Sequence, residues 1–196
     1  SSAPATDSAG DRMKPILGTM TFGSQVDRET SLAMVDSFLD QGYREIDTAY
    51  VYNNGDSERF IGAAVTALAA TQADIATKVN PRVADVFDAT ALRAQLEESL
   101  HRLDRDAVDL LYLHFPDPRT PLETTLDACA ELHAKGKFRA LGLSNFPAWQ
   151  VVEVWHLCER HGWPQPAVYQ GLYNGLSRGI EAELLPALRR HGMRFY

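Results

Sequence analysis

The sequence is poor in cysteine, carries fewer basic than acidic residues and lacks any long apolar run. Its 19 Lys and Arg against 26 Asp and Glu give a net charge of −7, which excludes nucleic acid or an anionic membrane as a bulk electrostatic partner. No apolar stretch approaches the roughly 20 residues of a membrane span. The two cysteines, Cys129 and Cys158, fall on different predicted helices and are typical of small buried side chains, which suits a reduced, cytoplasmic chain.

The first twelve residues are small and polar and contain no apolar segment, so we expect neither a signal peptide nor a strand there. Two interpretations stay open for residues 1–12: a disordered tail, or a remnant of cloning that precedes a true start at Met13. The chain is 45% hydrophobic, so residues 13–196 can bury a sizeable core as one domain.

Polar residues recur at the ends of short apolar runs about every 30 residues, the length of one strand–helix unit. One stretch with helical periodicity lies between each pair of these ends. Because parallel strands need a crossover, the alternation predicts a parallel α/β sheet. A (β/α)8 TIM barrel is favoured over an open doubly wound sheet, which rarely has a polar residue at every strand end. The six ends are Gly18-Thr19, Asp47-Thr48, Lys78, His114, Ser144-Asn145 and Gln170.

Periodicity, capping residues and glycines together predict seven strands and six helices. Leu92, Leu96, Leu100 and Leu103 mark one apolar helix face. The expected strands are 14–18, 44–47, 73–78, 107–114, 138–143, 167–170 and 193–196. The expected helices are 27–41, 56–70 with Asp56 or Ser57 as cap, 89–103, 121–135, 147–161 and 180–191.

A closed barrel needs eight strands and typically about 250 residues. Seven strands leave the first and the last as facing, unpaired edges. We therefore expect a TIM barrel truncated after about seven strands, in a protein that either continues for roughly 100 residues or has something else to cover the gap.

The strand ends at positions 47, 78 and 114 place an aspartate, a lysine and a histidine at one end of the predicted barrel. This end is the mouth, where the active sites of barrels lie. A phenol is a poor acid at neutral pH, and a neighbouring ammonium makes it a usable proton donor. Lys78 could supply that ammonium to Tyr52, and Asp47 could pair with the lysine. His114 could donate a hydrogen bond to a substrate oxygen. Each residue alone is better explained as a turn, rim or core residue, and their joint placement favours a site.

These residues resemble the catalytic tetrad of the aldo-keto reductase superfamily, with Asp47 to Tyr52, Lys78 and His114 in matching positions. The runs VDLLYLHFPDP, GKFRALGLSNF and PAVYQGLYN are similar to its fourth, fifth and sixth strands, most closely in the aflatoxin-aldehyde and succinic-semialdehyde reductase branch. The resemblance implies an NADPH-dependent carbonyl reductase in which Tyr52 is the general acid. It favours Tyr52 over its rival Tyr50, because the acid lies five residues after the aspartate.

The same resemblance assigns Asp47, Ser144, Asn145 and Gln170 to cofactor binding, the last three to the nicotinamide carboxamide. No GxGxxG follows a strand, so a Rossmann domain is not indicated. The family's stacking aromatic and its basic phosphate-binding segment would lie beyond Tyr196. We therefore expect the chain as given to bind NADPH weakly or not at all, with no ordered cofactor.

The substrate pocket is expected to have a mostly apolar wall from loops near the mouth: Met20, Phe22, Tyr50, Phe115 and Asn174. No metal is expected. His156, Cys158 and His161 are the nearest approach to a ligand set, but His156 points elsewhere and no further ligand is evident.

A small-molecule carbonyl compound is the expected substrate. The sequence leaves the oligomeric state open, with a homodimer as one option. Two other functions also stay open: a redox-inactive, NADPH-binding regulatory subunit on the same fold, and a barrel lyase or isomerase that uses Lys78 as a Schiff base.

Overall fold

The computed structural model describes residues 14–70 and 72–196, so the expected tail at 1–12 and the start at Met13 lie outside the described residues. Within this part, seven strands form one parallel sheet whose spatial order is the order of the sequence. This order is that of a barrel and not of a doubly wound sheet, in which the order reverses. The strands are β1 (Leu17–Gly18), β2 (Glu45–Asp47), β3 (Asp74–Val79), β4 (Val108–Leu113), β5 (Phe138–Ser144), β6 (Pro166–Gln170) and β7 (Arg194–Phe195).

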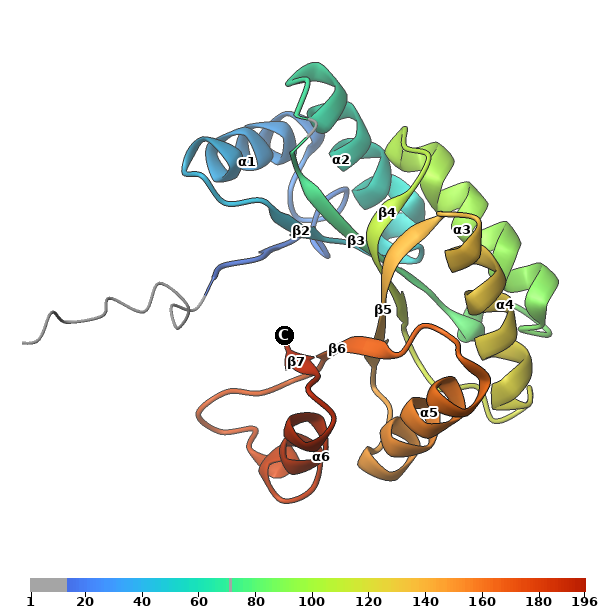
Figure 1. Cartoon of the computed structure of the whole chain (residues 1–196). Coiled ribbons are helices and arrows are strands. Elements are labelled where there is room, and N and C mark those ends of the chain that lie inside the picture. The colour runs from blue at the N-terminus through green and yellow to red at the C-terminus, as the bar shows by residue number, and fades with distance from the viewer. Residues whose placement is uncertain (1–13, 71) are drawn as a thin grey trace, which may run out of the picture.

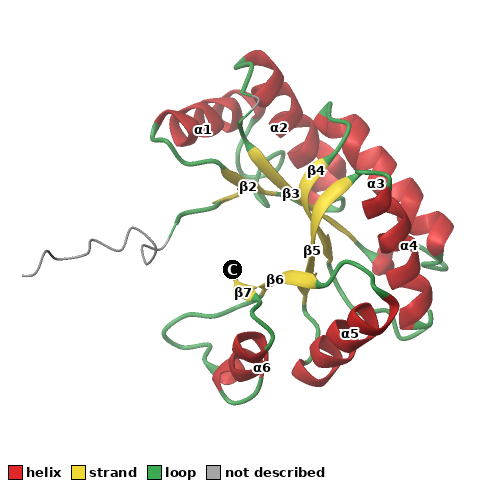
Figure 2. Cartoon of the chain, in the orientation of Figure 1, coloured by secondary structure: helices red, strands yellow, loops and turns green. Residues whose placement is uncertain are grey.

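The helices lie along the outer side of the sheet, which curls into an incomplete barrel (Figure 1). Each crosses from the end of one strand to the start of the next, and loops join them at both ends (Figure 2). They are α1 (Arg28–Asp40), α2 (Asp56–Ala67), α3 (Ala89–Leu103), α4 (Leu122–Ala134), α5 (Ala148–His161) and α6 (Leu184–Arg190). No α-helix among the described residues is long and apolar enough to cross a bilayer.

The helix ends show why these segments form helices. Asp27 caps α1 by accepting the Thr30 N–H at 2.8 Å, and Asp88 caps α3 by accepting two N–H groups. Gly162 ends α5 with a φ of 68°, a conformation that costs glycine little. The four leucines expected on the buried face of α3 are each at most 5% exposed, which confirms that face.

Two helices differ from the expectation. The helix expected over 180–191 begins as a 3₁₀ turn, Gly179–Glu181, and becomes α-helical only at Leu184. Pro186 explains the break, because proline lacks an N–H and its ring clashes with the carbonyl four residues earlier, at Ala182. The expected cap of α2 was also wrong: Gly55 is the N-cap, with a φ of 87°, and Asp56 is the first helical residue.

The core has two parts because β4 is buried on both faces. Leu111 and Leu113 belong to the large cluster that the sheet forms with the helices. Leu110 and Tyr112, which alternate with them, point to the inside of the curl and pack with Val168 of β6. This alternation explains why β4 reads as a nearly continuous apolar run.

Helices α2 and α3 approach closely at Gly62. A Cβ atom at this position would lie 2.6 Å from the carbonyl oxygen of Arg102 and 3.0 Å from the Cα atom of Leu103. Both neighbours are backbone atoms, so neither can move aside as a flexible side chain would. The absence of a side chain at Gly62 therefore sets the distance between the two helices.

We predict that Gly62→Ala lowers the free energy of unfolding by about 1–3 kcal/mol, measured by urea denaturation. In an open helix the same change would stabilise by roughly 0.5–1 kcal/mol, because alanine loses less backbone entropy. Gly175→Ala is the control, since nothing lies within 4 Å of its added Cβ. An unchanged or raised unfolding free energy for Gly62→Ala would contradict the proposed close contact.

Candidate active site

The carboxyl ends of the parallel strands carry the polar residues expected there. Asp47 is the last residue of β2, Lys78 the penultimate residue of β3, and His114 directly follows β4. Ser144 and Gln170 end β5 and β6. Since neighbouring parallel strands end at the same side of the sheet, these side chains lie around one mouth.

The Lys78 ammonium is the centre of this group. Its side chain is fully buried, and its Nζ donates to Asp47 Oδ2 at 2.6 Å and to the carbonyl oxygen of Thr48 at 2.6 Å. The third contact is a longer hydrogen bond of 3.4 Å to the Tyr52 hydroxyl. A buried ammonium is costly without partners, and here each of its three N–H groups has one.

Tyr52 is carried on the loop that joins β2 to α2 and begins a 3₁₀ turn, Tyr52–Gly55. Asn53 and Asn54 follow in the left-handed region, with φ of 50° and 55°, which asparagine tolerates better than most residues. The Asn53 side chain donates to the carbonyl oxygens of Met20 and Phe22, at 2.8 and 2.6 Å. The turn is therefore fastened to the loop after β1.

Three buried hydroxyl groups connect the ends of β1 and β2 to α2. The Ser57 Oγ lies 2.7 Å from Thr19 Oγ1 and 2.8 Å from Thr48 Oγ1, and it donates to the Thr19 carbonyl oxygen at 2.9 Å. Thr19 Oγ1 donates in turn to the Asp47 carbonyl oxygen at 2.8 Å. These bonds hold both ends of the Tyr52 loop.

His114 faces Tyr52 edge-on, with ring centroids 6.0 Å apart. Its Nδ1 lies 3.4 Å from Asn80 Nδ2. The Asn80 amide is oriented by its Oδ1, which accepts the Arg82 N–H at 2.8 Å, so its nitrogen faces the histidine. An amide nitrogen only donates, hence Nδ1 accepts and the ring proton resides on Nε2.

The pKa of His114 is lowered from 6.5 to about 4, mainly by burial and also by the positive charges of Lys78 and Arg82. The imidazole is therefore neutral at neutral pH, and its Nε2–H is available as a hydrogen-bond donor. Gln95 of α3 supports this arrangement by pairing with the Asn80 backbone at 2.7 and 3.0 Å.

The three residues expected at a carboxamide lie on the far side of the mouth. Gln170 Nε2 donates to Asp47 Oδ1 at 2.9 Å, which joins β6 to β2. Asn145 Nδ2 donates to the His114 carbonyl oxygen at 2.9 Å and to Ser144 Oγ at 3.1 Å. Within residues 14–70 and 72–196, the side-chain oxygens of Asn145 and Gln170 accept no hydrogen bond.

The expected pocket residues differ in what they contact. Met20 is 64% exposed, and Phe115 stacks on His114 with centroids 4.8 Å apart, whereas Phe22 is fully buried in the core. Asn174 accepts the N–H groups of its own loop at 176 and 177. Tyr50 turns to α3, where its hydroxyl donates to a glutamate at 2.7 Å. Phe22 is a core residue and not the wall residue we expected, and the Tyr50 contacts favour holding the loop over lining the pocket.

Burial raises the pKa of Tyr50, and its hydrogen bond to the Glu98 carboxylate raises it further. The phenol thus stays protonated, and its proton is directed to α3. This geometry favours Tyr52 over Tyr50 as the proton donor at the mouth.

Sequence reasoning missed two residues beside the site, the fully buried Tyr112 and the partly buried Arg102. Tyr112 lies on β4 with its ring 5.5 Å from Lys78 Nζ, and Gly142 leaves the space that this ring fills. Arg102 of α3 contacts the Tyr52 loop from below through the Tyr50 carbonyl oxygen. A charged residue between Leu100 and Leu103 of an apolar helix face is the one signal that could have indicated it.

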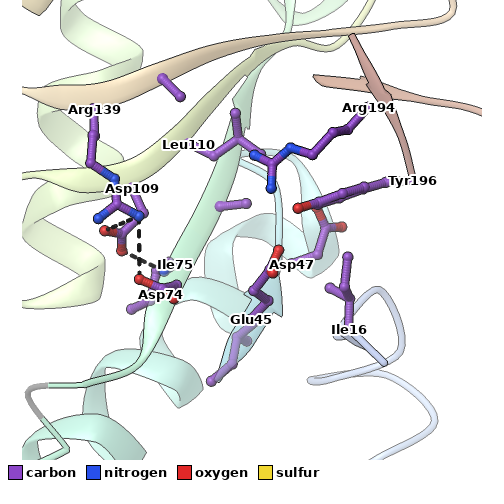
Figure 3. A pocket seen from close by; sticks show the side chains of 13 residues that line it. Ile16, Glu45, Asp47, Asp74, Ile75, Asp109, Leu110, Arg139, Arg194 and Tyr196 are labelled. Carbon is purple, nitrogen blue, oxygen red and sulfur yellow. Dashed lines mark hydrogen bonds and ion pairs between the residues drawn. The ribbon is translucent and has the colours of Figure 1, made fainter. Parts of the chain in front are cut away.

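A cavity of about 200 Å³ opens inside the curl, nearer the amino ends of the strands, and shares Asp47 with the strand-end group (Figure 3). Charged residues that begin the strands line it, and two of their pairs join Arg139 to Asp74 at 3.4 Å and to Asp109 at 3.3 Å. Burial raises the pKa of Tyr196, on its rim, to about 12. These pairs partly neutralise the charges near the amino ends of the strands, whereas Lys78, Tyr52 and His114 lie near the carboxyl ends.

Neither metal nor disulfide chemistry is indicated. The described residues contain no group of three His, Cys, Asp or Glu that could hold a metal ion. Cys129 and Cys158 are buried free thiols, and burial raises their pKa to about 12 and about 11, so both are unreactive.

The chain is similar to known proteins in both sequence and structure. The model of the Aldo/keto reductase family matches residues 15–196. Aflatoxin B1 aldehyde reductase member 2 of Mus musculus is 46% identical over 197 residues, which cover 98% of this chain and 54% of that protein. Aldo-keto reductase family 7 member A3 of Homo sapiens is 47% identical over 187 residues, 94% of this chain and 56% of that protein. The chain thus spans about half the length of these relatives.

Solved structures agree with this assignment. An aldo/keto reductase from Klebsiella pneumoniae, crystallised with NADP and acetate, superposes with a TM-score of 0.81 at 32% identity, over 92% of this chain and 61% of that one. An aldo-keto reductase from the same organism in complex with NADPH gives 0.82. The curled seven-stranded sheet is therefore the incomplete (β/α)8 barrel that the sequence predicts. With a family match over nearly its whole length and relatives 46–47% identical, the chain belongs to the aldo/keto reductase family.

Proposed function

We propose that this protein reduces aldehydes or ketones to alcohols with NADPH, and that Tyr52 donates the proton. The observation that carries the proposal is the Lys78 ammonium, bound to Asp47 at 2.6 Å and to the Tyr52 hydroxyl at 3.4 Å. The family membership and the relative from Mus musculus, which is named an aldehyde reductase, support a small carbonyl compound as substrate.

The residues at the far side of the mouth fit the nicotinamide of NADPH. Its carboxamide needs both an acceptor and a donor, and the free side-chain oxygens of Asn145 and Gln170 and the hydroxyl of Ser144 offer these. The solved relatives that bind NADP and NADPH support the same cofactor here. When bound, NADPH supplies the hydride.

The chain's own residues handle the proton. Tyr52 releases its proton to the carbonyl oxygen as negative charge develops there, and Lys78 stabilises the phenolate that remains. Asp47 balances the ammonium, which keeps the pair neutral overall inside the protein. The His114 Nε2–H donates to the same carbonyl oxygen and fixes its direction.

The geometry argues against a lyase that uses Lys78 as a Schiff base. All three N–H groups of Lys78 have acceptors, so no lone pair is free to attack a carbonyl carbon. We expect borohydride treatment with an aldehyde to leave Lys78 unmodified, measured by mass spectrometry.

A cytoplasmic location and a homodimer stay predictions.

We predict that Tyr52→Phe lowers kcat for 4-nitrobenzaldehyde by about 10²–10⁴-fold in the full-length protein, because the ring stays and the proton donor is lost. The rate is measured as loss of NADPH absorbance. NADPH binding, followed by fluorescence, should be unchanged.

The matched control is Tyr50→Phe, which removes the neighbouring phenol and should retain most of the rate. Turnover that survives Tyr52→Phe and fails in Tyr50→Phe would reverse the assignment of the acid. NADPH binding without turnover across a panel of aldehydes would favour the regulatory-subunit alternative instead.

His114 should titrate far below an ordinary histidine. Its folded pKa of about 4 lies below its ordinary value of 6.5, so the unfolded chain binds this proton first as the pH falls. The stability that neutral His114 contributes is therefore present above pH 6.5 and is lost as the pH falls to 4. We expect NMR to follow its ring titration to about pH 4.

In urea denaturation between pH 7 and pH 4.5, His114→Asn should lose less stability than the unmodified chain. A ring signal that titrates near pH 6.5 would show that the imidazole is solvated and charged in the mouth. It would remove the argument that a neutral Nε2–H orients the substrate.

A further inference from the structure

Arg102 is a partly buried cation on α3, and the reaction described above does not use it. Its side chain is 9% exposed, and it projects from α3 under the loop that carries Tyr52. Its Nη1 donates to the Tyr50 carbonyl oxygen at 2.9 Å and to Glu58 Oε2 at 3.1 Å. Its Nη2 pairs with Glu98 one turn earlier on the same helix.

The guanidinium also packs against the loop. Its Cζ lies 4.5 Å from the centre of the Tyr50 ring. At Gly55 an added Cβ would lie 2.5 Å from the same Cζ atom, so no side chain fits between the loop and the guanidinium. Arg102 therefore contacts the loop on both sides of Tyr52, two residues before it and three residues after it.

Glu58 connects this contact to the strand that carries Lys78. Its side chain is fully buried, and its second oxygen, Oε1, accepts the Thr77 hydroxyl at 2.6 Å. Thr77 precedes Lys78 on β3. The Glu58 carboxylate thus connects β3, which carries Lys78, to Arg102, which contacts the loop that carries Tyr52.

We propose that Arg102, through Glu58, is a positioning residue that sets the distance between the Tyr52 hydroxyl and the Lys78 ammonium. Tyr52 is not on a strand, so the sheet alone does not fix its hydroxyl. The loop is tied at the Tyr50 carbonyl and packed at Gly55, and both contacts end at one planar guanidinium. Lysine cannot replace this geometry, because an ammonium has neither the planar fork nor the flat face. The inference rests on the proposed function for its kinetic consequence only.

The decisive variant is Arg102→Lys, which keeps a positive charge for Glu58 and removes the fork. We expect kcat to fall by about 10- to 100-fold while KM for the aldehyde stays within about twofold, since the phenol is misplaced and the pocket is not. Arg102→Met removes charge and fork together and should also unfold at lower urea. Arg93→Lys is the matched control: Arg93 lies on the same helix and pairs outward with Glu131 at 2.5 Å.

A second readout does not need activity. In hydrogen exchange followed by mass spectrometry, Arg102→Lys should speed exchange in residues 48–55 and leave α5 unchanged, whereas Arg93→Lys should leave both unchanged. Unaltered exchange in 48–55 for Arg102→Lys would overturn the proposal.

The kinetic and exchange experiments separate the two ideas. If the protein reduces no aldehyde but Arg102→Lys still speeds exchange in the loop, the proposed function is contradicted and the contact between Arg102 and the loop is supported. In an active protein, Arg102→Lys added to Tyr52→Phe should cause no further loss, because the arginine acts through that phenol. A further loss equal to that in the unmodified background would show a general effect on the fold and overturn the positioning role.

Discussion

The ion pair between Asp47 and Lys78 is the interaction on which the mouth of the barrel depends. A fully buried ammonium carries a desolvation penalty of several kcal/mol unless its hydrogen bonds are satisfied. Asp47 meets that demand with one oxygen and binds Gln170 with the other, so one carboxylate orders three strands. The backbone carbonyl oxygen of Thr48 accepts a hydrogen bond from the same nitrogen. The polar end of the barrel is thus organised around a charge that the fold cannot leave unpaired.

The site combines two kinds of support. Asp47, Lys78 and His114 are placed by strands whose register is fixed by backbone ladders, so their positions follow from the sheet. Tyr52 stands on a loop outside the backbone ladders, and that loop is contacted by the side chain of Arg102 from α3. Precision in the second case comes from buried charge and close backbone packing. A carbonyl reductase built this way would depend on helix residues that never touch its substrate.

Much of this arrangement could be predicted from the sequence because strands and helices have characteristic periods. The apolar face of α3 and the polar residues at or next to the ends of β2 to β6 are local patterns, and the structure bears out both. Loop residues were harder: Phe22 is buried in the core and Tyr50 binds α3, since loop direction depends on distant partners. Arg102 meets the Tyr50 carbonyl across 52 residues of sequence, a separation over which no periodic pattern extends. Pro186 is visible in the sequence, and the late start of α6 at Leu184 could have been predicted from the missing N–H of this proline.

The hydrogen bond between Gln170 and Asp47 spans 123 residues, so it has a consequence for the order of folding. Contacts between neighbouring strands can form early, because each closes a loop of one strand–helix unit. The bond from β6 back to β2 closes a much larger loop and must wait until the three intervening strands, β3 to β5, are aligned. During synthesis, the carboxylate that steadies the lysine meets its last partner only after Gln170 has left the ribosome. The hydrogen-bonded group around Lys78 is therefore completed late in synthesis, after the strands of the first half of the barrel have been made.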